Sequence, residues 1–293
     1  MILVDPPRWP AHGTLFSHLV SDTSLEELHA FADAAGLDSR AFDHDHYDVP
    51  QRLYAAVVAA GASEVSGAEL VRRLVASGLR VRTPERTPRR SALAGVLERH
   101  WAELGIGHEA LGTGLLRRWS EAHRHYHDVR HLAAVLDALD VLGEGRLPVR
   151  LAAWFHDAVY AGAPDDEERS AVLAETLLDG VVAPDEVREV ARLVRLTRTH
   201  DPAAGDDAGA ALCDADLAVL GLPAGRYDVY VRDVRADYAH VPDAAWRLGR
   251  TQVIDSLLAL DPLYRTEAGR ALWAGRARDN LSRERRRWAG LSA

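Results

Sequence analysis

Histidine and aspartate recur in the middle of the chain at spacings that suit a metal centre. The segment RHYHDVRH places His127 and His131 four residues apart, so a helix would present both on one face. The segment LAAWFHDAVY places His156 and Asp157 side by side within an apolar run. Because a carboxylate in apolar surroundings is costly unless a cation or hydrogen bonds compensate it, this pair favours a bound metal ion.

A further aspartate pair follows in the segment LCDADLAVLG, where Asp214 and Asp216 lie in another apolar stretch. The order His, His-Asp, Asp then falls on three predicted helices. Imidazole nitrogens and carboxylate oxygens together suit a divalent ion and leave positions for water and substrate oxygens. The sequence therefore predicts a divalent metal cofactor, and it does not distinguish among Mn, Fe, Co, Ni, Zn and Mg.

Five blocks in this part of the chain occur in a recognisable order: YHDVRH, WFHDAVY, DEERSAVLAE, TRTH and DADLAVLG. Together they resemble the HD superfamily of metal-dependent phosphohydrolases, in particular a bacterial subgroup of predicted HD phosphohydrolases. The resemblance covers most of residues 91–293. It implies an all-α fold and metal-dependent hydrolysis of a phosphate mono- or diester, with a nucleotide among the candidate substrates. Asp128 and Asp166 stand where the subgroup has asparagine, so we expect Asp128 to add negative charge near the site.

The resemblance also implies roles for individual residues. The implied metal ligands are His131, His156, Asp157 and Asp216. His127 is similar to the histidine that protonates the leaving oxygen, so the catalytic candidates are His127 and Asp157. Candidates for contact with the substrate are Arg124, Arg130, His200, Asp214, Glu167 and Arg235, the arginines because guanidinium groups bind phosphate in a bidentate manner. Structural roles stay open for His127, for His200 at a helix C-terminus and for the arginines in salt bridges.

A second polar concentration lies near the N-terminus, in VDPPRWPAHG, FSHLVSD and FDHDHYDVP. Its candidate site residues are Asp5, His12, His18, Asp43 and His46. Strand alternation in HDHYD predicts Asp43, Asp45 and Tyr47 on one face and His44 and His46 on the other. These blocks resemble a small bacterial family known only as a domain of unknown function, which implies no activity. A polar loop with hydrogen-bonding roles and a separate reaction site are both open interpretations.

The elements that would position these residues fall into two parts. The segment TPERTPRR, residues 83–90, has two prolines and four charges, which predicts an extended, exposed linker. Residues 1–82 predict a small α/β module with a helix capped by Ser24 and Glu27 and a last strand at LRVR. Residues 91–293 predict a compact all-α domain. Its expected helices cover residues 91–105, 131–143, 149–160, 167–178, 184–200, 227–241, 243–260 and 269–288.

Composition limits the possible functions. The net charge of −9 argues against a nucleic-acid coat or a membrane-surface protein. A single cysteine, Cys213, excludes an intramolecular disulfide framework and fits a reducing compartment. With no apolar stretch of about 18 residues, we expect a cytoplasmic protein that acts on a small phosphorylated substrate. The alternative is a nucleotide-binding or sensor protein with a catalytically inert HD pocket; the oligomeric state is open.

Overall fold

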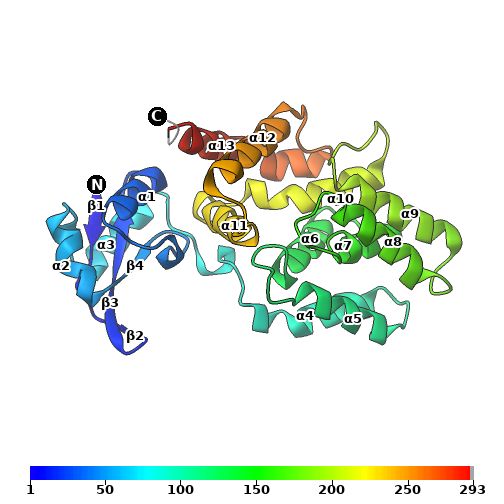
Figure 1. Ribbon diagram of the computed structural model, residues 1–293, viewed down its shortest axis with the longest axis horizontal. Helices are drawn as coiled ribbons and strands as arrows, with labels where there is room; N and C mark the ends of the chain where they lie inside the picture. Colours follow the sequence, from blue (N-terminus) through cyan, green and yellow to red (C-terminus); the bar gives the residue numbers. More distant parts are fainter. Residues whose placement is uncertain (291–293) are drawn as a thin grey trace. The chain divides into compact units, whose positions relative to one another are not determined.

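The computed structural model describes residues 1–290 and divides the chain into two compact units (Figure 1). The N-terminal unit comprises Met1–Arg86 together with Pro223–Arg232. The helical unit comprises Thr87–Leu222 and the described residues from Asp233 onward. The expected combination of a small α/β part and an all-helical part is confirmed. Unlike the expected boundaries, the structure assigns a short later segment to the N-terminal unit, so helix α11, Ala224–Asp237, contributes residues to both units.

A five-stranded sheet forms the centre of the N-terminal unit. Its strands are β1 (Ile2–Val4), β2 (Trp9–Ala11), β3 (Thr14–Ser21), β4 (Tyr47–Pro50) and β5 (Ser63–Glu64). Strand β3 pairs antiparallel with β2 through its first residues and with β1 through its last, while β4 pairs antiparallel with its middle part. Strand β5 joins β1 in parallel. In the β3–β4 pair, His18 lies directly opposite Asp48.

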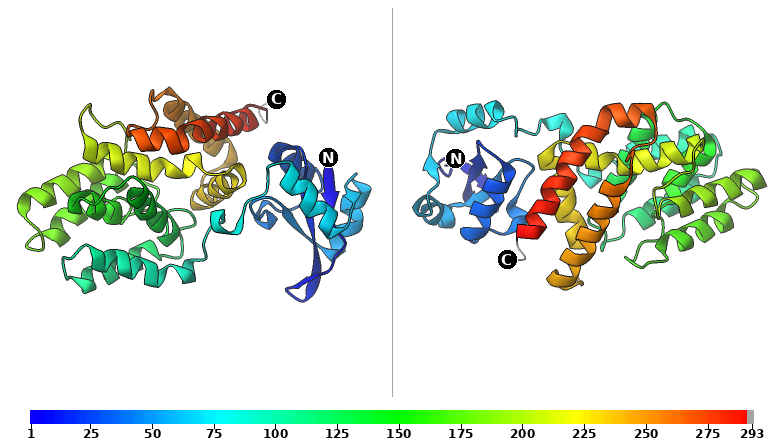
Figure 2. Two further views of the ribbon diagram at one scale, coloured as in Figure 1. Left: turned by 180° about the vertical axis from the view of Figure 1, so that it is seen from behind. Right: turned by 90° about the horizontal axis from the view of Figure 1, so that it is seen from above.

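Helices cover both faces of this sheet (Figure 2). Leu19 packs in a cluster with residues of α1 (Leu25–Ala34) and α2 (Gln51–Ala59), whereas Val20 packs with residues of α3 (Gly67–Ala76). Because strand side chains alternate, His18 lies on the same side as Val20. The expected cap of α1 is present, since the Ser24 side chain accepts a hydrogen bond from the backbone N–H of Glu27 at 3.1 Å.

Several local predictions in this unit are wrong. Residues 79–82 are not a strand, and the segment expected to be extended begins with a 3₁₀ turn, Thr83–Glu85. Residues 43–46 form a turn in which His44 has φ +65°, so the expected strand alternation does not apply there. Strand β3 was not expected, because its sequence mixes Ser and His with the apolar residues typical of a strand.

The described residues of the helical unit contain no strand, as expected. Its helices are α4 (Ala94–Glu103), α5 (Glu109–Trp119), α6 (Val129–Val141), α7 (Leu147–Phe155), α8 (Asp166–Leu178), α9 (Pro184–Leu196), α10 (Asp207–Asp216), α12 (Asp243–Ala259) and α13 (Glu267–Gly290), with 3₁₀ turns at Arg90–Ala92 and Leu217–Gly221. Helices α6, α7 and α10 contact one another (Figure 1). Helix α5 was not expected, because two glycines weaken its helical pattern.

Two helix boundaries differ from the predictions at the candidate site. Helix α6 begins at Val129, so His127 lies before the helix and does not share a helix face with His131. Helix α7 ends at Phe155, and His156 and Asp157 lie in the turn that follows. The apolar pattern of residues 149–160 therefore continues past the end of the helix.

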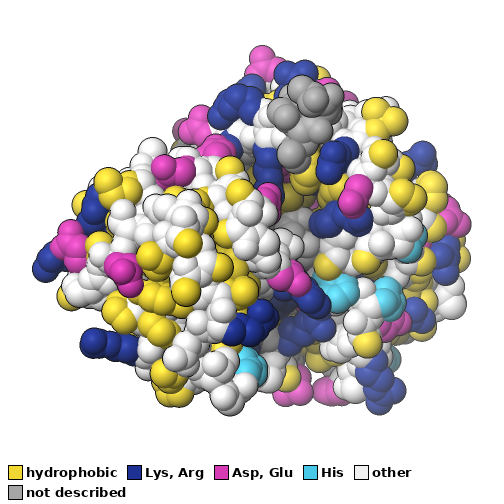
Figure 3. Space-filling model, turned by 60° about the vertical axis from the view of Figure 1, so that its left-hand side comes forward, with side chains coloured by type: hydrophobic (Ala, Val, Ile, Leu, Met, Phe, Trp, Pro, Cys, Tyr) yellow, Lys and Arg dark blue, Asp and Glu magenta, His cyan; other side chains and the backbone are white. Residues whose placement is uncertain are grey.

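No single helix among the described residues is long and apolar enough to cross a membrane. The bent pair Asp207–Gly221 and Ala224–Asp237 reaches the required length and composition only when its two segments are taken together. On the face shown in Figure 3, basic and acidic side chains are interspersed.

Candidate functional site

Side chains from three parts of the helical unit form one cluster, in which His131, His156 and Asp157 offer ligand atoms within 4.8 Å of one another and Asp216 lies against both imidazoles. His131 lies in the first turn of α6, His156 and Asp157 follow α7, and Asp216 is the last residue of α10. The Nε2 atom of His131 lies 3.1 Å from Nε2 of His156 and 3.0 Å from Oδ1 of Asp216. Nε2 of His156 lies 3.3 Å from Oδ2 of Asp157. Donors about 2.0–2.2 Å from one ion lie about 3 Å apart when neighbouring, so this spacing could hold a single divalent ion.

The position of the proton on the His156 ring determines which of its nitrogens faces the cluster with a lone pair. Its Nδ1 atom lies 2.9 Å from the carbonyl oxygen of Ala153, which can only accept, so Nδ1 carries a proton. In the neutral ring, Nε2 then presents a lone pair to His131, Asp157 and Asp216. The cluster therefore needs a positive charge at its centre, from a proton or from a metal ion.

The pKa shifts in the cluster have the same electrostatic origin. Burial lowers the pKa of His156, but the charges of Asp157 and Asp216 outweigh it and raise that pKa to about 9. Burial alone raises the pKa of Asp157, yet the charge and hydrogen bond of His156 hold it well below its usual range. The pKa of Asp216 is lowered in the same way by the imidazoles around it. Both carboxylates thus favour a cation between them.

Arg124 fixes the loops that carry the cluster and does not face a substrate. Its side chain is fully buried, and Nη1 donates to the carbonyl oxygens of Asp157 at 2.7 Å and His127 at 3.0 Å. Its guanidinium carbon lies 5.5 Å from the ring centroids of both Trp119 and Tyr160. The expectation of a phosphate contact at Arg124 is therefore corrected to a structural role, in which one guanidinium ties two site loops together.

A carboxylate that the sequence did not single out orients His127. Asp237, whose side chain is fully buried, lies with Oδ2 at 2.7 Å from Nδ1 of His127. The same carboxylate accepts backbone N–H bonds from Tyr126 at 3.2 Å and His127 at 3.3 Å. The imidazole also stacks on Tyr160, with centroids 4.2 Å apart. Asp237 follows 110 residues after His127, and only the fold brings the two together.

His200 contacts the cluster through Asp216. It lies in the turn after α9 with φ +51°, and its Nε2 is 2.8 Å from Oδ2 of Asp216, whose other oxygen faces His131. The structure therefore gives His200 a positioning contact with an implied ligand. Glu167, in the first turn of α8, is half-buried. Burial raises the pKa of Glu167, and the negative charge of Asp157 raises it further, which places this carboxyl near the cluster.

The two departures from the resembled subgroup have structural explanations. Asp128 is the fully buried N-cap of α6, accepts from the backbone N–H of Arg130 at 2.7 Å and pairs with Arg90 Nε at 2.6 Å. Nε of Arg130 also donates to both Asp128 oxygens, at 3.1 and 3.0 Å. The two arginines compensate the charge of Asp128, and Arg130 is not free to bind a phosphate. Asp166 accepts from the N–H groups of Ala161 and Ala163 and so closes the loop before α8.

Two further substrate candidates are also engaged elsewhere. Asp214 is fully buried and accepts from the backbone N–H groups of Arg265 at 2.7 Å and Thr266 at 2.8 Å, next to the start of α13. Arg235 donates to the carbonyl of Val241 at 3.0 Å and to Asp243 at 2.7 Å. Both expectations of substrate contact are corrected to structural roles.

Arg198 is a cation that was not among the arginines expected to contact a substrate. It is exposed in the turn between α9 and His200, and its charge acts on Glu167. Within the described part of the chain its side chain makes neither a hydrogen bond nor an ion pair. The block TRTH contains it, but nothing in the sequence distinguishes it from the paired arginines around it.

A second His and Asp group in this unit has a simpler explanation. His100, Asp137 and Asp140 lie close enough to share an ion. Arg150 donates to Asp140 at 2.5 Å and lies 3.3 Å from Nδ1 of His100, so a guanidinium already supplies the positive charge. Both aspartates are exposed. We interpret this group as a surface ion network.

The N-terminal candidates divide into two sets. Asp5, His18 and His46 line one cleft of the N-terminal unit. Asp43 lines the same cleft but pairs with His44 and, at 3.3 Å, with Nη1 of Arg86. His12 lies apart from this set, exposed in the turn between β2 and β3 with φ +48°.

Comparison with known proteins identifies the N-terminal unit only. Residues 2–77 match the model of a family described as "Protein of unknown function (DUF4031)". This match confirms the expected resemblance to a domain of unknown function. No curated protein and no solved structure matches the chain.

Proposed function

We propose that the helical unit is an HD-type, metal-dependent phosphohydrolase that acts on a phosphate mono- or diester. The observation that carries the proposal is the cluster of His131, His156, Asp157 and Asp216, in which the Nε2 atoms of the two histidines lie 3.1 Å apart and each lies 3.0–3.7 Å from an oxygen of Asp157 and of Asp216. The order of these residues in the sequence, and the resemblance stated for it, support the same conclusion.

The donor set fits a divalent ion by its chemistry. Two imidazole nitrogens and two carboxylates match ions from Mn²⁺ to Zn²⁺ and leave coordination positions for substrate oxygens. A divalent ion held there would lower the pKa of water and polarise a phosphoryl oxygen. His200 holds Asp216 in place, and the Nδ1–H bond of His156 to Ala153 directs its Nε2 toward the centre.

His127 is the residue placed to move a proton. Its side chain is 20% exposed, and its ring centroid lies 5.8 Å from that of His131, so it lies beside the cluster. Because Nδ1 faces Asp237, Nε2 is the atom left to protonate a leaving oxygen. Proton transfer of this kind contributes about 10²–10⁴-fold to a rate.

Arg198 is the guanidinium available to a substrate phosphate, since Arg124, Arg130 and Arg235 are engaged within the protein. The planar guanidinium can bind two phosphate oxygens at once.

The test is a screen of nucleotides and simple phosphoesters with metal-stripped protein resupplied with Mn²⁺, Co²⁺, Mg²⁺ or Ni²⁺. We expect metal-dependent release of phosphate or of a monoester by the wild type and none by His156→Ala. His108→Ala, which changes an exposed histidine at the start of α5, is the matched control and should keep the wild-type rate.

Two results would contradict the proposal. No turnover with any of these ions would exclude the enzyme, and turnover retained by His156→Ala would place the activity elsewhere. A nucleotide that binds tightly and is recovered unchanged would support the alternative of a sensor with an inert pocket.

A further inference from the structure

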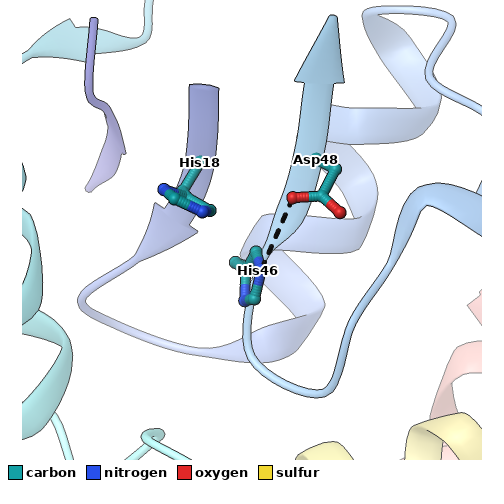
Figure 4. A group of neighbouring side chains, drawn as sticks. All are labelled: His18, His46 and Asp48. Atoms are coloured by element: carbon teal, nitrogen blue, oxygen red, sulfur yellow. Dashed lines mark ion pairs between the residues drawn. The ribbon is translucent and has the colours of Figure 1, made fainter. Parts of the chain in front are cut away.

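A second group of metal-binding side chains lies in the N-terminal unit. Asp48 of β4 and His18 of β3 are direct cross-strand partners, so their side chains lie next to each other on one face of the sheet. His46 immediately precedes β4, and its ring centroid lies 5.0 Å from that of His18. Each of the three residues offers a ligand atom within 4.8 Å of the others (Figure 4).

Each of the two imidazoles contacts a buried carboxylate through its Nδ1 atom, which leaves Nε2 as the possible metal ligand. Nδ1 of His18 lies 3.1 Å from Oδ2 of Asp5, and Nδ1 of His46 lies 2.7 Å from Oδ1 of Asp45. The Asp5 and Asp45 side chains are only 5% and 0% exposed. Nε2 of His46 then faces Asp48, with Oδ1 at 3.6 Å. A carboxylate behind each imidazole fixes the ring and makes it a stronger ligand, as in protein metal sites.

The carboxylates behind the rings are themselves fixed. Asp5 accepts from the backbone N–H of His18 at 2.5 Å and from Nε1 of Trp9 at 3.3 Å. Asp45 accepts from the backbone N–H of Val81 at 2.8 Å. Rigid support of this kind keeps donor atoms at a defined separation, which a loop of solvated polar residues does not do.

The group opens into a cleft rather than into the core. The cleft has a volume of about 1480 Å³, and its lining includes His18, His46, Asp48 and Asp5 as well as three arginines, Arg8, Arg80 and Arg86. Asp48 is 47% exposed and His18 27% exposed at the side chain. Three protein ligands with one side open is the arrangement of metal sites that keep a position for water or substrate.

We propose that His18, His46 and Asp48 bind a divalent transition-metal ion, separate from the ion proposed for the helical unit, with its free positions facing the cleft. Imidazole and carboxylate donors select ions such as Zn²⁺, Mn²⁺ or Fe²⁺ over Ca²⁺. The N-terminal unit then has a metal-dependent site of its own.

The experiment measures Zn²⁺ bound per full-length chain after chelator treatment, reloading with Zn²⁺ and removal of free metal. Asp48→Asn, nearly isosteric at a half-exposed position, is expected to lower the content by one equivalent. His18→Ala is expected to give the same loss. His12→Asn, which keeps a residue that tolerates φ +48°, is the control and should retain the wild-type content.

Repeating the series in the His156→Ala background separates the two proposed sites. Asp48→Asn should lower the Zn²⁺ content by the same amount in the wild-type protein and in the His156→Ala variant, whether or not His156→Ala itself lowers that content. Circular dichroism checks that each variant is folded. Asp48→Asn or His18→Ala that stays folded and keeps the full Zn²⁺ content overturns the N-terminal site and leaves the proposal for the helical unit unaffected.

Discussion

At the residue scale, Asp237 contacts the proposed proton donor, His127, but not the implied metal ligands. Its carboxylate contacts Nδ1 of His127 at 2.7 Å, and none of its contacts involves an implied metal ligand. We expect Asp237→Asn to lower kcat about 10–100-fold, as the loss of an orienting partner does in other sites, without a change in metal content.

The measurement is kcat for both proteins, with metal content determined in parallel. An unchanged kcat would show that Asp237 is only structural, and loss of metal would show that the pair belongs to the metal centre. Asp233→Asn, on the same helix, is the control for a general effect of charge.

Arg198 offers a second prediction at this scale. Because its guanidinium is exposed and unpaired within residues 1–290 and its charge acts on Glu167, Arg198→Ala should raise KM for a phosphoester about tenfold or more and change kcat little. Arg195, three residues earlier, pairs with Glu168 at 2.7 Å and Glu175 at 2.8 Å. Arg195→Ala should therefore change neither KM nor kcat. Equal effects of the two variants in steady-state kinetics would refute a specific role for Arg198.

The proximity of His131, His156, Asp157 and Asp216 could be anticipated from their types and their order along the chain. The first three offer ligand atoms within 4.8 Å of one another, and Asp216 contacts both imidazoles. Asp237 and Arg198 could not be found in this way. Asp237 is distinguished by its contact with His127 and Arg198 by the lack of an ion-pair partner among the described residues, and only tertiary packing determines either feature. The same reason explains Arg124, where a plausible phosphate ligand is buried against backbone carbonyls.

At the element scale, helix α5 shows how one glycine fixes a packing distance. A Cβ at Gly112 would lie 2.6 Å from ring atoms of Trp101, whose Nε1 donates to the His108 carbonyl and whose ring meets Trp154 edge-on. We expect Gly112→Ala to lower the free energy of unfolding by about 1–3 kcal/mol through overpacking.

Gly114 of the same helix supplies the matched control. Nothing lies within 4 Å of a Cβ at that position, so Gly114→Ala should raise the free energy of unfolding by about 0.5–1 kcal/mol. Urea denaturation of both variants tests the pair. Equal destabilisation by the two substitutions would mean that α5 does not pack against α4 through this glycine.

Long helices were predictable because their apolar residues recur at helical spacing and because of start signals such as Pro184, the first residue of α9. The ends of the helices near the site could not be predicted. Residues 155–160 contain no glycine or proline that would mark the end of α7, so the apolar periodicity alone extends the predicted helix past His156. That turn matters, because it lets adjacent side chains, His156 and Asp157, reach the same point.

At the scale of the whole molecule, the N-terminal unit depends on a segment far along the chain. Val229 of α11 is 3% exposed in the core of that unit, Asp228 lies 3.1 Å from Nε2 of His29, and Arg232 donates to the carbonyl of Phe42. The regular helical pattern of residues 227–241 gives no sign that the helix contributes to both units. A division of the sequence at one linker therefore misses the later segment of the N-terminal unit.

This dependence predicts a selective effect of Val229→Ala in the full chain. Amide protons of α1 and β4 should exchange faster with solvent, because the cavity weakens the core they share, while those of α9 stay protected. Val172→Ala, at a 47% exposed position of α8, is the control and should leave both regions unchanged. Undiminished protection of α1 and β4 would contradict the assignment of Pro223–Arg232 to the N-terminal unit.

The proposed function of the helical unit is tested most directly by the rate of phosphoester hydrolysis as a function of the metal bound to that unit. Metal-free Asp48→Asn protein, which isolates the helical centre, would be titrated with Mn²⁺ against the best substrate from the screen. We predict that the rate rises with the metal bound and that His156→Ala in the same background removes both the binding and the rate. Hydrolysis that is independent of bound metal, or that survives His156→Ala, would contradict the central claim.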